Sequence, residues 1–404
     1  MTPAQPDPPR QQSAVEGRPA ASGLRSAATR EDAASQGAPA PRQEMSALLV
    51  SGSIGMGHDA LAAACSVVLE RRGYRTDTLD AMRLLGRRGS SAGERVFRTM
   101  LAVPGLFDAV HFAALRPGTR LALLADAAAR RQVVPRLREY LDEHPADLAV
   151  SVFATAASAL SQLAPACPAM SHVVFCTDVT PHRLWVHPNV DLYLVTSSVA
   201  EAAVRRFAPD ARVRVVPPPV RPGFYAAPPQ DAARDQLGIP LQERCVLLMS
   251  GAWGLGPVAS AAEALGQAGV HVLAVAGRNA RLERALTAVA ARQPRVRAIG
   301  FTDAVPVLMA AADLVITSSG DTCTEARTVG RPLLLLDVVP GHGRDNLQHE
   351  LELGDAGVTG PGTADVLRTT LAALDRVKPP EPGPARPAAA FEAAFGAALA
   401  EIGA

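Results

Sequence analysis

The feature that most constrains the fold is an alternation of short apolar runs with helical stretches, which occurs twice along the chain. The apolar runs are bounded by Gly or polar residues, so they predict buried strands. Strands that alternate with helices predict a parallel sheet wrapped by helices. The proline-rich stretch Val215–Gln230 separates the two series and predicts a domain boundary. We therefore expect an α/β chain of two doubly wound, Rossmann-like domains that face a cleft.

The apolar pattern places the elements as follows. In the first half we expect strands Ala47–Ser51, Thr76–Leu79, Leu148–Phe153, Ser171–Cys176, Leu192–Thr196 and Val213–Val216, with helices Ala60–Arg72, Leu121–Glu143 and Ser198–Phe207 among them. In the second half we expect strands Cys245–Ser250, Val270–Ala276, Val296–Gly300, Leu314–Thr317 and Pro332–Leu336, helices Val258–Ala268, Arg281–Arg292, Ala304–Ala311 and Thr324–Val329, and a last helix Ala388–Ile402.

Composition narrows the classes of partner. The 404 residues carry a formal net charge of +1, which argues against nucleic acid as the main partner. The five cysteines are irregularly spaced without a CxxC pair, so we expect a reduced, cytoplasmic protein without a structural metal. No apolar run reaches the roughly 20 residues of a membrane span. Residues 1–44 lack the apolar stretch of a signal peptide and are expected to form a disordered Ala/Pro-rich tail.

A glycine-rich loop follows the first expected strand, in the sequence SGSIGMGHDA. Small residues such as Gly55 and Gly57 let backbone N–H groups approach a ligand, and the start of a helix favours an anion. His58, at the end of this loop, suits a general base. The alternatives are a tight turn that needs glycine and a histidine that only caps or packs.

A second candidate stretch is CTDVTPHRLWVHP, which follows the strand expected to end at Cys176. Asp178, His182 and Trp185 suit a pocket that orients a hydroxyl group and packs a sugar or an acyl chain. The alternative is a helix-capping aspartate and a core tryptophan.

The third candidate stretch runs from Ile316 to Asn346. Hydroxyls and backbone N–H groups at a helix start suit a pyrophosphate, and a carboxylate one turn later suits the hydroxyls of a ribose. The alternative for that carboxylate, Glu325, is a first-turn residue favoured by the helix dipole. The residues expected to contact a nucleotide here are Ser319, Gly320, Thr322 and Glu325, with Gly341, His342, Arg344 and Asn346 on a following loop and Gly251, Gly254 and Gly256 on an earlier one.

Together these motifs resemble the GT-B glycosyltransferases of the MurG-like group, and most closely the monogalactosyldiacylglycerol synthase branch (glycosyltransferase family 28 type). The resemblance covers about residues 46 to 370. The matching motifs are G-x-G-H at Gly55, Gly57 and His58, T-D…H…W at Thr177, Asp178, His182 and Trp185, P-V-x-x-x-F at Pro219, Val220 and Phe224, G-F at Gly300 and Phe301, the T-x-x-E-A loop at Thr322 and Glu325, and P-G-…-N at Pro340, Gly341 and Asn346.

The chain departs from this pattern at three places. Asp321 stands where a glycine is usual, and an aspartate repels a diphosphate unless it points away or a cation intervenes. His342 and Gly343 replace a Gln-Glu pair, so a donor-sugar contact is lost or replaced. Trp253 interrupts the glycine loop that opens the second domain.

The resemblance implies an inverting transfer of a hexose from a UDP-sugar to a hydroxyl of a lipid such as diacylglycerol. It implies an acceptor-binding domain over 45–216, a linker over 217–240, a nucleotide-sugar-binding domain over 241–378, and a Pro-rich segment with a helix over 379–404. His58 or Asp178 is expected to be the base, with His182 beside them. The backbone near Phe301 is expected to read the nucleotide base.

The resemblance implies no cofactor beyond the donor substrate, and no carboxylate pair calls for a metal. Between Leu84 and Arg138, apolar residues mixed with arginines suggest peripheral contact with an anionic membrane from the cytoplasmic side; ordinary packed helices are the alternative. Two alternatives remain open. One is a GT-B glycosyltransferase that acts on a soluble or natural-product acceptor, and the other is a non-catalytic relic that binds a nucleotide sugar. An epimerase is disfavoured, because a carboxylate-rich active site is not evident.

Overall fold

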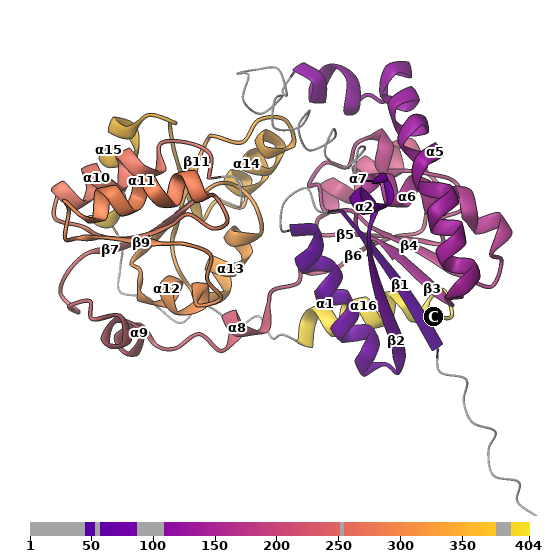
Figure 1. Cartoon of the computed structure of the whole chain (residues 1–404), viewed down its shortest axis with the longest axis horizontal. Helices are drawn as coiled ribbons and strands as arrows, with labels where there is room; N and C mark the ends of the chain where they lie inside the picture. Colours follow the sequence, from indigo (N-terminus) through magenta and orange to yellow (C-terminus); the bar gives the residue numbers. More distant parts are fainter. Residues whose placement is uncertain (1–44, 53–56, 87–108, 251–253, 377–388) are drawn as a thin grey trace, which may run out of the picture. The chain divides into compact units, whose positions relative to one another are not determined.

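A computed structural model describes residues 45–52, 57–86, 109–250, 254–376 and 389–404. The first half of the chain forms a parallel sheet in the order β2-β1-β3-β4-β5-β6 (Figure 1). The order reverses between β1 and β3, and ligands of such sheets gather at the carboxyl ends of the strands at this point. The elements of this half are β1 (Met45–Ser51), α1 (Gly57–Arg71), β2 (Tyr74–Asp80), α2 (Ala81–Leu84), η1 (His111–Leu115), α5 (Arg120–Glu143), β3 (Leu148–Ser151), α6 (Ala154–Leu163), η2 (Ala164–Ala166), β4 (Ser171–Phe175), η3 (Arg183–Trp185), β5 (Leu192–Val195), α7 (Ser198–Phe207) and β6 (Val213–Val215).

The second half forms another parallel sheet, in the order β12-β11-β10-β7-β8-β9. Its order reverses between β7 and β10, where the loop after β10 carries the third candidate stretch. The elements are α8 (Pro222–Tyr225), α9 (Gln230–Leu237), β7 (Cys245–Met249), α10 (Val258–Gln267), β8 (His271–Val275), α11 (Ala280–Ala290), β9 (Val296–Ile299), α12 (Val305–Ala311), β10 (Leu314–Thr317), α13 (Asp321–Val329), β11 (Leu333–Leu336), α14 (His342–Glu352), β12 (Ala356–Thr359), α15 (Thr363–Leu374) and α16 (Ala389–Ala400).

The inner strands of both sheets are buried on both faces, which is why they are apolar runs without a polar side, whereas the edge strands are partly exposed. In β1, Ala47 and Leu49 pack in the cluster that includes α1 and α16, whereas Leu48 and Val50 pack in the cluster that includes α5 and α6. Successive side chains of a strand point to opposite faces, so one strand serves two layers of the core. The predicted α/β class with two Rossmann-like sheets is confirmed.

The last helix of the chain, α16, packs on the first sheet (Figure 1). Phe391 and Phe395 stack with ring centroids 5.5 Å apart, and Phe391 also lies 6.2 Å from the ring of Phe175 in β4. Arg71 of α1 forms a 2.6 Å ion pair with Glu392. The C-terminal helix therefore completes the core of the first half of the chain.

Several predicted element boundaries were wrong. Helices α1 and α13 begin earlier than expected, and α14 stands where a loop was expected, so Gly57, His58, Asp321 and His342 lie in first helical turns. The short helix α8 lies within the proline-rich stretch, because proline at the first helical position has no N–H to lose. The strand β12 and the helices α9, α14 and α15 were missed. The expected tail over 1–44 and the Pro-rich residues 379–388 lie outside the described residues.

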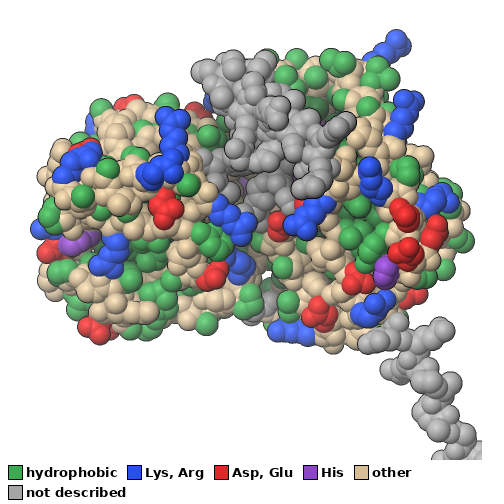
Figure 2. All heavy atoms as spheres, in the orientation of Figure 1, with side chains coloured by type: hydrophobic (Ala, Val, Ile, Leu, Met, Phe, Trp, Pro, Cys, Tyr) green, Lys and Arg blue, Asp and Glu red, His purple; other side chains and the backbone are tan. Residues whose placement is uncertain are grey.

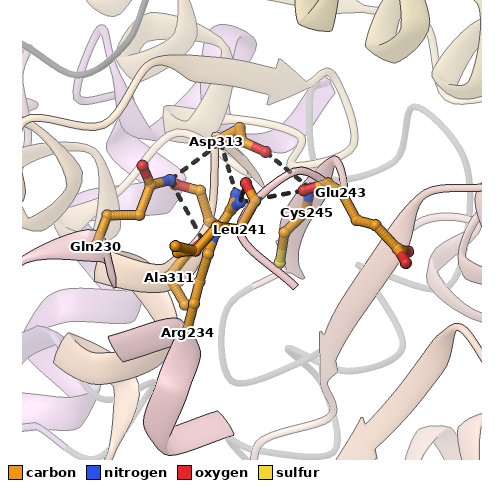
Figure 3. Close-up of polar contacts among 8 residues, drawn as sticks. Gln230, Arg234, Leu241, Glu243, Cys245, Ala311 and Asp313 are labelled. Atoms are coloured by element: carbon orange, nitrogen blue, oxygen red, sulfur yellow. Dashed lines mark hydrogen bonds and ion pairs between the residues drawn. The ribbon is translucent and has the colours of Figure 1, made fainter. Parts of the chain in front are cut away.

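A buried polar network joins the segment before β7 to the second sheet (Figure 3). Arg234 of α9 is 3% exposed, and its Nη2 donates to Oδ1 of Asp313 at 2.7 Å. Its Nε donates to the carbonyl of Ala311, and its Nη1 to the carbonyls of Leu241 and Glu243. The other oxygen of Asp313 accepts the N–H of Cys245, and Nε2 of Gln230 donates to Oδ1. Every charged or polar group in this network is therefore partnered, as burial requires.

Candidate active site

A cavity of about 750 Å³ is lined by residues from the carboxyl ends of both sheets. It brings together candidates from all three sequence stretches, which lie far apart along the chain. The predicted site residues that line it are Gly57, His58, Asp178, Ser319, Gly320, Glu325, His342 and Asn346. Those that are described but do not line it are His182, Gly254, Gly256, Phe301, Thr322 and Gly341. Gly55 and Gly251 lie outside the described residues.

His58 lies in the first turn of α1, directly after Gly57, rather than in a loop as predicted. Its Nδ1 lies 2.7 Å from the carbonyl oxygen of Val152, and its ring meets Phe153 edge-on at 5.2 Å. Because a carbonyl can only accept, Nδ1 must carry the proton of the neutral ring. Nε2 is then the nitrogen with the lone pair, so His58 is arranged to accept a proton at Nε2.

Asp178 follows β4 and is held on the floor of the cavity by Trp185, whose Nε1 donates to Oδ2 at 3.0 Å. Burial by itself raises the pKa of Asp178, but His182, His342, the indole N–H and His58 outweigh it, and the net pKa is lowered. Asp178 is therefore a carboxylate at neutral pH. Trp185 is only 2% exposed, so its predicted role in packing a sugar or an acyl chain was wrong; it is a core residue that orients Asp178.

His182 lies beside Asp178, with Nε2 at 3.7 Å from Oδ2. Its Nδ1 accepts the backbone N–H of Leu184, so the proton of the neutral ring lies on Nε2 and faces Asp178. Burial lowers the pKa of His182, and Asp178 only partly offsets this effect. His182 is therefore a neutral neighbour of Asp178 and has no free nitrogen with which to accept a proton from a substrate.

The first turn of α13 forms the opposite wall of the cavity. Its N-cap, Gly320, offers no side-chain cap, so the first N–H groups of this helix lack intrahelical partners and suit an anion. The hydroxyl of Ser319 donates to the carbonyl of Gly343 at 2.9 Å, which ties this loop to the start of α14 and leaves only the backbone of Ser319 for a phosphate.

Glu325, one turn into α13, is 8% exposed and paired with Arg221. Both Nε and Nη2 of Arg221 donate to the same oxygen, Oε1, at 3.1 and 2.9 Å. Burial raises the pKa of Glu325, and Arg221 opposes this effect. Within the described residues Oε2 makes no hydrogen bond, so one oxygen remains for a ligand. Arg221 was missed because it is 104 positions away from its partner.

Asp321, the first residue of α13, lines the cavity beside the first turn of α1 and is exposed to solvent there. A Cβ atom on Gly57 would lie 2.7 Å from Oδ2 of Asp321, so the carboxylate contacts the start of α1 closely. Burial raises the pKa of Asp321, whereas His58 and Arg221 lower it. The side chain is therefore directed at the first sheet's half of the cavity.

The stretch Gly341–Asn346 is the start of α14 rather than a loop, because Gly341 is its N-cap with a φ of 66°. Asp345 of this helix pairs with His111 at 3.3 Å and with Arg116 at 3.2 Å. The ring of His111 lies 6.3 Å from those of both His182 and His342. Burial lowers the pKa of His342, which makes it a neutral hydrogen-bonding group beside Asp178.

Gly254 and Gly256 have structural reasons for being glycine. Both have positive φ, at 59° and 88°. A Cβ atom on Gly254 would lie 2.7 Å from Leu282, and one on Gly256 would lie 2.8 Å from Val338. Phe301, predicted to mark the nucleotide-base site, is half exposed, and the guanidinium of Arg278 lies 4.6 Å from its ring centroid.

Residues 119–220 match the family model for monogalactosyldiacylglycerol (MGDG) synthase. Over this stretch the chain is similar to the MGDG synthases. It is 32% identical over 185 residues to a processive diacylglycerol beta-glucosyltransferase of Bacillus pumilus, a match that covers 45% of this chain and 48% of that relative. It is 34% identical over 206 residues to monogalactosyldiacylglycerol synthase 2 of Arabidopsis thaliana, covering 46% and 43%. The matches thus span less than half the length of these relatives.

Solved structures show the GT-B fold over most of the chain. UGT89C1 of Arabidopsis thaliana, complexed with UDP, aligns with a TM-score of 0.59 over 90% of this chain and 100% of that chain, at 12% identity. Alr3699/HepE of Anabaena, in complex with UDP, aligns with a TM-score of 0.53 over 89% and 99%, at 19% identity. The predicted GT-B fold is thus confirmed, and the predicted resemblance to MGDG synthases is confirmed as sequence similarity over part of the chain.

Proposed function

We propose that the chain is an inverting glycosyltransferase that transfers a hexose from a UDP-sugar to a hydroxyl of a lipid such as diacylglycerol, at the surface of an anionic membrane. The observation that carries this proposal is the cavity itself. It sets a histidine with its lone pair on Nε2 opposite a helix N-terminus suited to a diphosphate. The names of the sequence relatives supply the class of acceptor.

In the proposed reaction the acceptor hydroxyl gives its proton to Nε2 of His58. The acceptor oxygen forms a bond to C1 of the sugar as the bond from C1 to the diphosphate breaks, and UDP leaves with the electron pair. The first N–H groups of α13 face the charge that develops on the diphosphate. Oε2 of Glu325 accepts from the ribose hydroxyls. Asp178, ionised and held by Trp185, orients the acceptor or the sugar rather than serving as the base.

The test is transfer of labelled glucose or galactose from the UDP-sugar to diacylglycerol in mixed micelles. We expect a β-linked glycolipid, and in His58→Gln a loss of turnover of about 100-fold or more, the usual contribution of a general base. His144→Gln is the matched control, because His144 is exposed and bonds only within its own helix end. Full turnover in His58→Gln would refute the assignment of the base.

The same assay separates the alternatives. Turnover only with a soluble or natural-product acceptor favours the second class of enzyme. UDP-sugar binding without transfer to any acceptor favours a non-catalytic relic. Absence of both binding and transfer contradicts the proposal.

Membrane contact rests on α5. Leu121 and Leu124 are 73% and 68% exposed at the start of this arginine-rich helix. Exposed apolar side chains beside arginines suit an anionic bilayer surface. Figure 2 shows basic side chains dispersed over the described part of the face in view. No helix in the described residues is both long enough and apolar enough to cross a membrane. The apolar segment expected around Phe97 and Phe107 lies outside the described residues.

The membrane test is co-sedimentation with vesicles that contain phosphatidylglycerol. We expect the double variant Leu121→Ser/Leu124→Ser to bind less than the unchanged chain. Leu241→Ser is the control, since Leu241 is 58% exposed but lies beside the second sheet. If all three proteins sediment equally with the vesicles, or if none of them sediments, α5 is ruled out as the membrane contact.

A further inference from the structure

The carboxylate of Asp321 lies at the start of α13, a helix whose N-terminus is suited to a diphosphate, and it lines the cavity. Yet the side chain contacts the first turn of α1, where Oδ2 would lie 2.7 Å from a Cβ atom on Gly57. The next residue along α1 is His58. The charge of Asp321 is thus set beside the proposed base.

Two carboxylates interact electrostatically with His58, and they differ in their other partners. Asp178 already accepts the indole N–H of Trp185 and faces Nε2 of His182. Asp321 makes no hydrogen bond within the described residues and lines the cavity. The charged and titratable groups around His58 are Asp178, Asp321 and His342, and Arg221 acts in turn on Asp321.

We propose that Asp321 is a positioning residue for His58: its carboxylate stabilises the imidazolium that forms when Nε2 takes the proton of the acceptor hydroxyl. This inference rests on the proposed function. The proton moves from the acceptor oxygen to Nε2 and Asp321 remains ionised throughout. Nδ1 of His58 is already committed to the carbonyl of Val152, so a second charge partner must act from the cavity side.

The same charge has a cost for donor binding. A carboxylate near a diphosphate repels it, so the arrangement exchanges donor affinity for turnover. This predicts opposite effects of the charge on UDP affinity and on turnover, which a purely structural role does not produce. Removing the charge should tighten UDP binding and slow the chemical step.

The experiment compares Asp321→Asn, Asp321→Gly and Asp321→Glu with the unchanged chain. In Asp321→Asn and Asp321→Gly we expect the acid limb of the kcat profile to move to lower pH, because a nearby opposite charge favours the protonated base. We also expect kcat to fall while UDP binds more tightly. Asp321→Glu should restore part of kcat. Asp375→Asn, an exposed carboxylate paired with Arg244, is the control.

A second measurement needs no turnover. By reciprocity, His58 must act on Asp321 as strongly as Asp321 acts on His58. In His58→Gln we therefore expect the pKa of the Asp321 carboxyl, followed by carbon NMR, to rise, because a positive neighbour that lowers it is lost. An unmoved pKa would overturn the positioning role whatever the activity shows. If this pKa moves but the unchanged chain shows no transferase activity, the proposed function is contradicted instead. If Asp321→Gly improves both kcat and UDP binding, Asp321 only repels the donor and the inference is wrong.

Discussion

Removing the side chain of Arg234 should destabilise the second half of the chain far more than removing an exposed arginine. Arg234→Ala deletes the guanidinium that partners Asp313 and three carbonyls, those of Ala311, Leu241 and Glu243 (Figure 3). Breaking a buried ion pair by removing one partner costs about 3–5 kcal/mol, because the other charge stays behind. Asp313 keeps two donors and is partly exposed, so we expect about 3 kcal/mol.

Arg292→Ala is the matched control. Arg292 pairs with Glu263 at 2.6 Å, closer than the 2.7 Å between Arg234 and Asp313, but its side chain is 54% exposed. Exposed pairs contribute about 0–1 kcal/mol, so burial rather than distance should decide the difference.

The assay is urea unfolding, with hydrogen exchange to locate the effect. About 3 kcal/mol corresponds to a fall in Tm of roughly 6–12 °C for a domain of this size. Exchange should accelerate in α9, α12 and β10 and remain unchanged in the first sheet. If Arg234→Ala and Arg292→Ala lie within about 1 kcal/mol of each other, the reasoning from burial is refuted.

Three further predictions concern the site and its support. Glu325→Ala should weaken UDP binding about tenfold or more, because a charged hydrogen-bond acceptor is lost. Asp178→Ala should mainly lower turnover. Equal UDP affinity in Glu325→Ala and the unchanged chain would contradict the assignment of Glu325 to the ribose. Trp185→Phe removes a donor that lowers the pKa of Asp178, so carboxyl NMR should find that pKa raised, and an unchanged value would mean that the indole N–H is not the cause. Burial lowers the pKa of His172 from 6.5 to about 4, so between pH 6.5 and about 4 the unfolded chain binds a proton that the folded chain does not. The free energy of unfolding should therefore fall by about 3 kcal/mol as the pH drops through this range. In urea titrations, His172→Gln should weaken this dependence of the free energy of unfolding on pH.

Apolar runs predicted the fold well because fully buried parallel strands need no polar residues. Leu314–Thr317 and Ser198–Phe207 match the structure residue for residue. β12 was missed because Ala356–Thr359 is short, contains a glycine, and lies at the sheet edge with two exposed residues. The start of α1 was misplaced and α14 was missed because glycines in their first turns dilute the helical signal.

The candidate site was predictable only as a set of loops. Ligands of such sheets gather at the carboxyl ends of the strands, so Asp178 after β4 and Ser319 after β10 could each be expected beside a ligand, and both line the cavity. Some pairings in the site join residues far apart in the sequence, such as Arg221 with Glu325 and, 234 positions apart, His111 with Asp345. They depend on the conformation of the loops, which the spacing of residues in the sequence does not predict. The sequence therefore predicted the types of residue at the site but not which of their atoms are already engaged.

That difference favours His58 over Asp178 as the proposed base, a choice that the sequence left open. A base needs a lone pair that faces the substrate and is not already used in a hydrogen bond. The existing hydrogen bonds of each side chain show which of its lone pairs are still available. Asp178 is ionised, but its lowered pKa makes it a weaker proton acceptor, and Oδ2 already takes the indole N–H of Trp185. His58 gives its only ring proton to the backbone carbonyl of Val152. Because that carbonyl is part of the main chain just after β3, no side-chain substitution removes it. The tautomer of His58 is therefore set by the sheet itself, and only a change that moves this strand end or replaces His58 should change which group accepts the proton.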